Sequence, residues 1–475
     1  MSSNLRDACE RLREPKHYER LKLFFLSITF FMVIAAYSII RDLKNSIFSS
    51  VVGADYIPYV KICVWIFLIP AILFYSKIVD KVRRYNLLIT YSLVYAVLCL
   101  FFAFFLLDPV RGLENTNQSP YRLFGWIFFI FAEGFSPFVL GVFWAFSNSI
   151  NSPESAKNNY GIMVSGSKLG GMFSTGLAWL FFGMHTTPFF GKLTDAGKHS
   201  VILIFASICL FIIPVLIYAL MKVVPGKYLH GYESAYKAEK ERGKRDKAAT
   251  GMFAGLWMIL KYPYVLGIFS MIFFYEILNT IMSLLRVKVA QSATSSVGEM
   301  SQYLLGWVFV MHFVGFLVSL IGTSALMRKL GTKTCVMLIP ISMGAMVLAF
   351  IMGSSPFVLM ATYTLMKMIN YAFSSPVMES LYIPTLKDIK FKSKSWIDAF
   401  GSKFAKSSGS TINILMGYLG PALLMPVYSL FFAVIIGVWF VAALLLGRRF
   451  DKAIENKEVV GLSDDDDREK GLKEA

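Results

Sequence analysis

Twelve segments of the chain consist almost wholly of apolar residues and are separated by polar stretches. Each has close to the 20 residues that an α-helix needs to cross the hydrocarbon core of a membrane. This pattern predicts an all-α membrane protein with twelve transmembrane helices. The expected spans cover residues 21–40, 57–78, 87–107, 124–149, 160–183, 200–221, 263–285, 302–323, 334–353, 356–375, 402–424 and 427–447.

The polar stretches also suggest how the chain is divided. A basic linker at 222–262 separates two groups of six spans, which predicts an N-terminal half at 21–221 and a C-terminal half at 263–447. Residues 1–20 are expected to form a cytoplasmic N-terminus. Residues 448–475, with four consecutive aspartates, are expected to form a charged cytoplasmic tail without a packed structure.

Two short motifs recur in the same order in both halves. Ser38-Ile-Ile-Arg41 near the end of the first span matches Ser283-Leu-Leu-Arg286 near the end of the seventh. The fifth span begins Gly-Ser-Lys168, and the eleventh begins Gly-Ser-Lys403. The repetition predicts duplicated halves in a major-facilitator-like arrangement, with a substrate site between them near mid-membrane.

Lysine and arginine residues mark one side of the membrane. They gather at the N-terminus, in the loops after spans 2, 8 and 10, and in the central linker, all on one side for a count of twelve. The loops between spans 9 and 10 and between spans 11 and 12 have none. Positive loops stay in the cytoplasm, so both termini are predicted to be cytoplasmic.

Composition supports this class and excludes others. The 475 residues are 56% hydrophobic and only 16% charged, whereas a soluble protein has about 25% charged residues. The net charge of +17 comes largely from the loops, so we expect no binding to nucleic acid. The five cysteines are scattered without metal-ligand spacing, which predicts neither a metal site nor a cofactor.

Enzyme signatures are missing as well. Gly161 to Lys168 resembles a phosphate-binding loop, but Ser167 occupies the position of the required lysine. His312 is the one histidine clearly inside a span, and we interpret it as a packed or hydrogen-bonded residue. A carrier is therefore favoured over an ATP-driven pump or an enzyme.

The charges inside the expected spans are mostly positive, with nine cations against three carboxylates. Ionisable groups in a membrane are costly and usually serve a transport pathway or a ligand. A cavity lined by such cations favours a small phosphorylated anion as the substrate. The residues are Arg41, Asp42, Lys44, Lys61, Glu133, Lys168, Glu276, Arg286, Lys288, Lys367, Lys403 and Lys406.

Simpler interpretations exist for some of these charges. Arg41, Lys44, Arg286 and Lys288 lie near the expected helix ends, where long side chains reach the interface. Lys367 fits a packing role beside a carboxylate. Glu133 and Glu276 are candidates either for pairing with the lysines when the site is empty or for binding a proton.

Several motifs resemble a known family, the nucleotide transporters of obligate intracellular bacteria and plastids (the ATP/ADP translocase, NTT or TLC, family). The matching elements occur in the family's order through nearly all the spans. They are Ile40-Arg41-Asp42-Leu43-Lys44, Ile57-Pro58-Tyr59-Val60-Lys61, Ala132-Glu133, Phe143-Trp144-Ala145-Phe146-Ser147-Asn148, Pro153-Glu154-Ser155-Ala156-Lys157, Glu276, Tyr382-Ile383-Pro384, Lys394-Ser395-Trp396-Ile397-Asp398 and Lys406.

The resemblance implies which charges transport needs and where the protein works. Lys61, Glu133, Glu276 and Lys406 are the positions carried over as required, in a bacterial cytoplasmic (inner) membrane. Together with the charge pattern, this gives two expected groups of site residues. The expected substrate-binding residues are Lys61, Arg41, Lys44, Glu133, Asn148, Lys168, Glu276, Arg286, Lys403 and Lys406. The expected coupling or gating residues are Glu133, Glu276, Asp42 and Asp398.

The resulting prediction is a monomeric secondary transporter that moves nucleotides across a lipid bilayer by alternating access. One alternative is a proton-coupled carrier of inorganic phosphate, NAD or another small phosphorylated anion. A second alternative, from another class, is a membrane scaffold or sensor whose basic linker binds anionic lipid or a partner.

Overall fold

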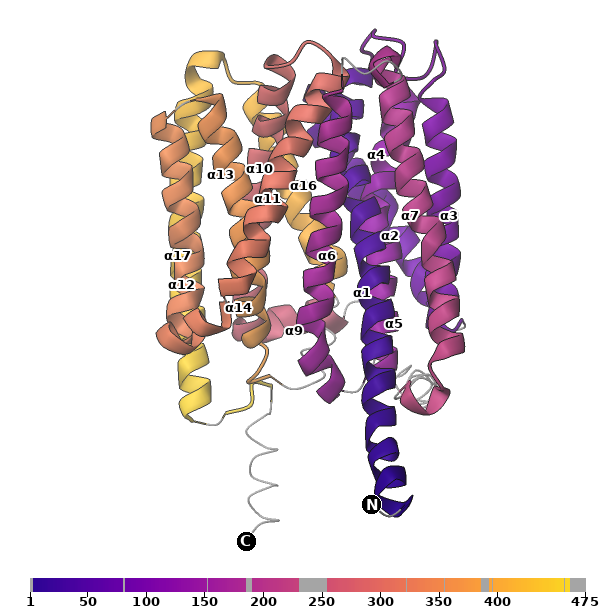
Figure 1. Cartoon of the computed structure of the whole chain (residues 1–475). Helices are drawn as coiled ribbons and strands as arrows, with labels where there is room; N and C mark the ends of the chain where they lie inside the picture. The colour runs from indigo at the N-terminus through magenta and orange to yellow at the C-terminus, as the bar shows by residue number, and fades with distance from the viewer. Residues whose placement is uncertain are drawn as a thin grey trace. The chain divides into compact units, whose positions relative to one another are not determined.

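The structure, a computed structural model, describes residues 3–79, 82–151, 153–184, 190–229, 254–321, 323–353, 355–385, 393–394, 396–456 and 458–461. These residues are almost entirely helical (Figure 1). They contain no β-strand, only an isolated bridge between Thr385 and Val460. The α-helices are α1 Ser3–Val51, α2 Ile57–Val79, α3 Arg84–Phe105, α4 Leu123–Phe135, α5 Gly141–Ile150, α6 Pro153–Phe182, α7 Asp195–Val223, α9 Ala254–Lys261, α10 Pro263–Ser292, α11 Val297–Ile321, α12 Thr323–Gly353, α13 Pro356–Ile369, α14 Ser375–Ser380, α16 Ser402–Gly417 and α17 Pro421–Glu455.

Nine segments within the described ranges are long and apolar enough to cross a membrane. In lipid a backbone must satisfy its own hydrogen bonds, which a helix does. The segments are Lys16–Val51, Ala54–Ala71, Arg84–Phe105, Leu123–Ile150, Asp195–Val223, Pro263–Ser292, Val297–Val318, Lys329–Gly353 and Ala422–Glu455. The all-α membrane class is thus confirmed, while the count of twelve spans stays a prediction.

The three expected spans outside this set also coincide with helical structure. Residues 160–183 lie in α6, whose last residue is Phe182. Residues 356–375 cover α13 and the π-helical turn η6 (Asn370–Ser374). Residues 402–424 begin with α16, but this helix ends at Gly417.

Several expected boundaries differ from the helix ends, among them the ends of the first and eleventh spans. The first span was predicted to end at residue 40, yet α1 continues to Val51, because the charges after residue 40 are paired inside the protein and do not end the helix. The eleventh span was predicted to reach residue 424, but α17 already starts at Pro421. Proline is well tolerated in the first turn of a helix, where its missing N–H has no partner to lose.

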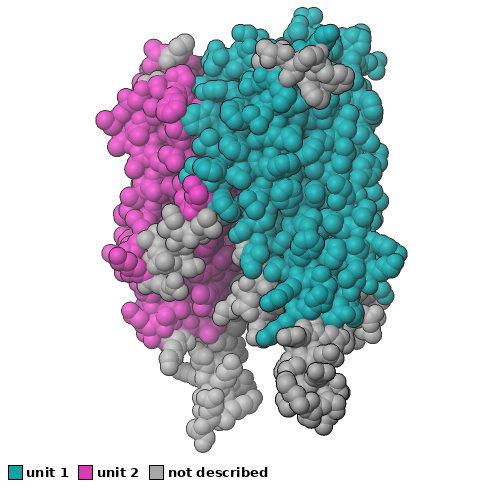
Figure 2. Space-filling model, in the orientation of Figure 1, with its two compact units in different colours: residues 1–60, 66–246, 287–316 teal, residues 61–65, 247–286, 317–475 magenta. Residues whose placement is uncertain are grey.

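The chain forms two compact units, coloured separately in Figure 2. Unit 1 contains residues 1–60, 66–246 and 287–316, and unit 2 contains residues 61–65, 247–286 and 317–475. The boundaries cut through α2, α10 and α11. The division at the central linker therefore stays a prediction, distinct from these units.

In unit 1, helix α1 packs against α6, α7 and α4, and α3 packs against α7 (Figure 1). Residues 287–316 join this unit through a stacked contact between Trp179 and Phe309, with ring centroids 6.1 Å apart. A buried hydrogen-bonded chain reinforces it. The Nε2 atom of His199 lies 2.7 Å from Ser301 Oγ, which donates to Ser46 Oγ at 2.6 Å.

Helices α1 and α6 approach closely because α6 carries glycine at the contact. A methyl group at Gly170 would overlap the backbone carbonyl oxygen of Phe31, and one at Gly166 would lie 3.4 Å from that of Ser27. Small residues four apart on one face allow such contacts between membrane helices. Gly170 is the tighter of the two positions.

We expect Gly170→Ala to destabilise the protein by about 1–3 kcal/mol, because α1 must shift to make room for the methyl group. Gly437, in α17, is the matched control because a methyl group there meets nothing within 4 Å. Gly437→Ala should be neutral or slightly stabilising. Thermal unfolding of both variants in detergent tests this, and equal melting temperatures would contradict the proposed close packing.

In unit 2, helix α12 packs against α17 and α13 (Figure 1). The helix has a break at Gly331, whose φ of 76° lies in the left-handed region that favours glycine. The hydroxyl of Ser355 accepts a hydrogen bond from the backbone N–H of Val358 at 3.2 Å and caps α13. This cap fixes the start of the helix that carries Lys367.

Candidate functional site

Unit 1 brings four of the expected site residues together as two ion pairs. Arg41 lies 2.9 Å from the carboxylate of Asp42, and Lys44 lies 2.5 Å from that of Glu133. Asp42 and Lys44 are only 4% and 6% exposed. A buried charge is tolerated when it has such a partner. The ion pair of Lys44 connects α1 to α4.

Aromatic rings complete this cluster. The guanidinium of Arg41 lies over the ring of Tyr37 at 5.3 Å, and the ammonium of Lys44 lies 5.0 Å from the ring centroid of Phe129. Both distances are within the range in which a ring attracts a cation. Each of these cations therefore has both a carboxylate and an aromatic neighbour.

Lys168 belongs to the same part of unit 1. Arg41, Asp42 and Lys168 lie close enough to act electrostatically on the imidazole of His312. The Nε2 atom of His312 also lies 3.4 Å from Ser38 Oγ. The histidine is thus packed beside the charged cluster, as its isolation in the sequence suggested.

The other expected residues of unit 1 are more exposed than this charged cluster. Asn148 is exposed on α5. Lys288 forms an ion pair with Asp55 at 2.7 Å, and both side chains are exposed. Lys288 therefore fits the simpler interpretation of a long side chain that extends from a helix end. This interpretation does not describe Lys44, or Arg286 of unit 2, which is only 3% exposed.

In unit 2, the central carboxylate is Glu276 of α10. Its Oε1 lies 3.8 Å from the ammonium of Lys406 in α16, and its Oε2 accepts a hydrogen bond from Asn279 at 3.0 Å. Two residues carried over from the family resemblance thus face each other. Their contact is longer than the one between Lys44 and Glu133.

Lys61 lies in the short part of α2 that belongs to unit 2. One helical turn further on, the ring of Trp65 packs against Phe404, with centroids 6.0 Å apart. Phe404 directly follows Lys403, and both precede Lys406 in α16. Within unit 2, the segment of α2 that carries Lys61 and Trp65 therefore lies beside the cationic helix α16.

Lys367 is a candidate that the sequence analysis treated only as a packing residue. Its ammonium lies 5.9, 5.9 and 5.7 Å from the rings of Tyr275, Tyr363 and Tyr371. Arg286 lies over the same Tyr363 ring at 4.9 Å. Among the described residues Lys367 forms no ion pair, although the charge of Glu276 also acts on it. The signal available in the sequence was the four-residue spacing of Tyr363, Lys367 and Tyr371.

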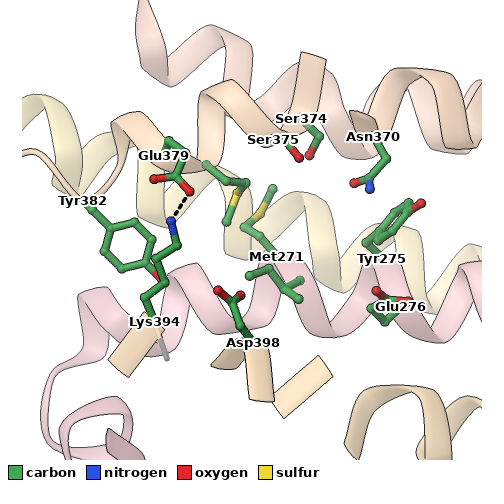
Figure 3. Close-up of a pocket in the computed structure, with 12 residues that line it drawn as sticks. Met271, Tyr275, Glu276, Asn370, Ser374, Ser375, Glu379, Tyr382, Lys394 and Asp398 are labelled. Carbon is green, nitrogen blue, oxygen red and sulfur yellow. Dashed lines mark hydrogen bonds and ion pairs between the residues drawn. The ribbon is translucent and has the colours of Figure 1, made fainter. Parts of the chain in front are cut away.

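A pocket of about 180 Å³ lies next to this group in unit 2 (Figure 3). Glu379 and Lys394 form an ion pair at one end, beside Tyr382, while Tyr275, Glu276 and Asn370 lie at the other. The remaining lining residues are Met271, Ile272, Ser374, Ser375, Met378 and Asp398. The pocket has a mixed apolar and polar lining, with three carboxylates against one lysine. Glu379 and Lys394 were not among the expected site residues.

Asp398 faces this pocket from the π-helical turn η7 (Ile397–Gly401), just before α16. The side chain is exposed, but the surrounding protein atoms displace bulk water and raise the pKa of the carboxyl to about 6. Lys394 acts in the opposite direction, and Glu379 adds to the increase. Asp398 therefore changes charge near neutral pH.

The pKa of Asp398 predicts a pH-dependent stability. In the unfolded chain this carboxyl has its ordinary pKa of 3.8, so between about pH 4 and 6 the folded protein binds the additional proton. Stability should therefore fall as pH rises through this window. Melting temperatures of the wild type and of Asp398→Asn measure it. The wild type should lose stability relative to the variant between about pH 4 and 7, and parallel curves would contradict the raised pKa.

Three π-helical turns lie beside charged residues of these sites. They are η2 (Ser136–Leu140), η6 (Asn370–Ser374) and η7 (Ile397–Gly401). Glu133 precedes η2 by three residues, Lys367 precedes η6 by three residues, and η7 contains Asp398. Such turns are rare and occur frequently at functional sites.

Within the described ranges, no group of three or more His, Cys, Asp or Glu residues is suited to hold a metal ion.

Comparisons with known proteins agree with this picture. The chain is 24% identical to ADP,ATP carrier protein 1 of Chlamydia trachomatis, over 94% of this chain and 92% of the relative. It is 23% identical to ADP,ATP carrier protein 1 of Rickettsia bellii, over 93% of this chain and 96% of the relative.

The fold is similar to that of a D-xylose–proton symporter, with a TM-score of 0.60, 10% identity, and coverage of 91% of this chain and 97% of the symporter. At this identity the similarity concerns the fold alone, which is major-facilitator-like. The family model described as "TLC ATP/ADP transporter" matches residues 12–121 and 120–450. The chain belongs to the TLC ATP/ADP transporter family.

Proposed function

We propose that this protein exchanges ATP for ADP across a bacterial cytoplasmic membrane by alternating access. The observation that carries the proposal is the arrangement of charges in its membrane helices. Lys44 and Lys406 are each paired with a carboxylate that a polyanion can replace. The names of the relatives, which are ADP,ATP carriers, support the choice of nucleotide.

The two lysine–glutamate pairs suggest how substrate is bound and released. A phosphate group forms strong charge-assisted hydrogen bonds and competes with Glu133 for Lys44 and with Glu276 for Lys406. When the nucleotide leaves, each carboxylate returns to its lysine, so no cation is left uncompensated in the membrane. Arg41, Lys61, Lys168, Arg286 and Lys403 add positive charge to these two groups.

We further propose the arrangement in the membrane that the sequence predicts. It comprises twelve spans in two six-helix halves, both termini in the cytoplasm, and a monomer as the working unit. The helical structure of residues 356–369 and 402–417, which lie outside the nine long apolar segments, supports the count. Labelling of single cysteines introduced at Asn117 and Lys333 tests the sidedness, since these two positions are expected on opposite faces.

The function is tested by uptake of labelled ATP into liposomes that contain the purified protein. Uptake that requires internal ADP supports exchange. Uptake of labelled phosphate or NAD driven by a proton gradient, with ATP inert, would instead support the carrier of a smaller or different phosphorylated anion. A protein that moves none of these solutes would contradict the transporter proposal.

A further inference from the structure

Unlike Lys44 and Lys406, Lys367 has no ion-pair partner among the described residues. Three tyrosine rings, from Tyr275, Tyr363 and Tyr371, lie within 6 Å of its ammonium. Glu276 contributes a favourable charge, but its carboxylate is engaged by Lys406 and Asn279. Rings stabilise a cation without neutralising it. Lys367 therefore keeps its full positive charge at a place where charge is costly.

A second observation at the same place is the hydroxyl of Tyr275. The side chain is only 6% exposed, yet its Oη has no hydrogen-bond partner within the part of the chain that the structure describes. Leaving a buried hydroxyl unsatisfied costs about 1–3 kcal/mol in a folded protein. The Tyr275 hydroxyl is a hydrogen-bond donor, and Lys367 beside it is a cation without an ion pair among the described residues. Together they form a site for an oxyanion.

The position in the first half that corresponds to Lys367 carries a carboxylate, not a cation. Arg286 matches Arg41 in the repeated sequence motif, and Lys367 matches Glu133 by its position three residues before a π-helical turn. In unit 1, Glu133 neutralises a nearby lysine. In unit 2, the equivalent position carries a second cation instead, and Lys367 and Arg286 share the ring of Tyr363.

From this geometry we propose that Lys367 Nζ and Tyr275 Oη bind a phosphate group of the nucleotide, with Arg286 behind the Tyr363 ring adding positive charge. This inference deepens the proposed function and rests on it for the identity of the cargo. The site binds phosphate without first breaking an ion pair. Lys44 and Lys406, in contrast, must exchange a carboxylate for the substrate.

The adjoining pocket shares Tyr275 with this site. Tyr275 and Asn370 line its end opposite the ion pair of Glu379 and Lys394, and the Tyr275 hydroxyl points away from that ion pair (Figure 3). The acidic lining of the pocket is unsuited to phosphate but suits the hydroxyls of a ribose. A nucleotide bound with its phosphate at Lys367 therefore has room for its neutral part in the pocket.

The test compares Lys367→Met, Lys367→Arg and Tyr275→Phe with the wild type and with Lys333→Met, a matched lysine variant at an exposed ion pair. The purified full-length protein is titrated with ATP, ADP, pyrophosphate and adenosine, and binding is followed by thermal stabilisation. Lys367→Met should weaken binding of ATP and pyrophosphate about ten- to a hundredfold and leave adenosine unchanged. Lys367→Arg should retain most of the affinity.

The Tyr275→Phe variant distinguishes a role of the hydroxyl in phosphate binding from a role in packing. Since its hydroxyl has no hydrogen-bond partner among the described residues, its removal should leave the melting temperature of the ligand-free protein unchanged or raised. Its affinity for pyrophosphate should nevertheless fall about fivefold to tenfold. Unchanged pyrophosphate affinity in both Tyr275→Phe and Lys367→Met, or equal losses for adenosine and ATP, would overturn the proposal.

The experiment also distinguishes this inference from the proposed function. Pyrophosphate binding that depends on Lys367, in a protein that transports no nucleotide, would uphold the phosphate site and refute ATP/ADP exchange. Exchange of ATP for ADP that persists with normal affinity in Lys367→Met would uphold the function and refute the site.

Discussion

Replacing Lys406 by methionine is expected to lower ATP/ADP exchange by about a hundredfold, in protein that still folds and inserts normally. Lys406 is partly exposed and lies 3.8 Å from Glu276, so its ammonium is accessible to a substrate phosphate. The variant loses this attraction. It also leaves Glu276 as an uncompensated anion that repels the nucleotide. Counterflow of labelled ATP against internal ADP in proteoliposomes measures the effect.

Two further variants complete this test. Lys333→Met removes a lysine of the same unit that is 3.7 Å from Asp451 at an exposed ion pair, and exchange should be unchanged. Glu276→Gln removes the competitor of the phosphate, so the half-saturating ATP concentration should fall while the maximal exchange rate decreases because release is slower. Full activity of Lys406→Met would refute the assignment of this lysine to the substrate.

The membrane class was evident from the sequence because it depends on local composition. Each apolar segment of about 20 residues predicts its own helix without reference to the rest of the chain. Helix ends were predicted less well. The α1 helix continues past Arg41, Asp42 and Lys44 to Val51 because partners on the chain neutralise them, including one on α4. That long-range pairing is not visible in a window of sequence.

The sequence pointed to charged residues inside the spans as candidates, but it did not show which of them are partners. Glu133 and Glu276 were candidates either for pairing with lysines or for binding a proton, and in the structure Lys44 contacts the first and Lys406 the second. Lys61, an equally plausible partner from its sequence, lies instead in the segment of α2 that belongs to unit 2. Which lysine meets which carboxylate depends on how the helices pack.

The tyrosine surroundings of Lys367 could be predicted only in part from the sequence. Tyr363 and Tyr371 are spaced to flank Lys367 on one helix, which the sequence could have revealed. Tyr275 comes from α10, and its unsatisfied hydroxyl becomes apparent only once the helices are packed. The same holds for Asp398, whose raised pKa depends on Glu379 and on pocket walls contributed by other helices.

The largest effect on folding is expected from breaking the ion pair of Lys44 and Glu133. Removing one partner of a buried pair typically costs about 3–5 kcal/mol, because the remaining charge is left uncompensated. Glu133→Gln and Lys44→Met should each destabilise the protein by this amount. The double variant has no isolated charge and should be much closer to the wild type. Lys288 and Asp55, an exposed pair in the same unit, should give no more than about 1 kcal/mol in the matched control cycle.

Transport measured in the same four proteins separates packing from function. If the pair only stabilised the fold, the double variant would recover exchange along with its stability. If Lys44 binds phosphate and Glu133 displaces it, the double variant should be stable but inactive, since neither binding nor release is restored. A stable double variant that exchanges ATP at the wild-type rate would therefore contradict the role proposed for this pair. A stable and inactive one would show that the charges, rather than the packing of α1 against α4, are what transport requires.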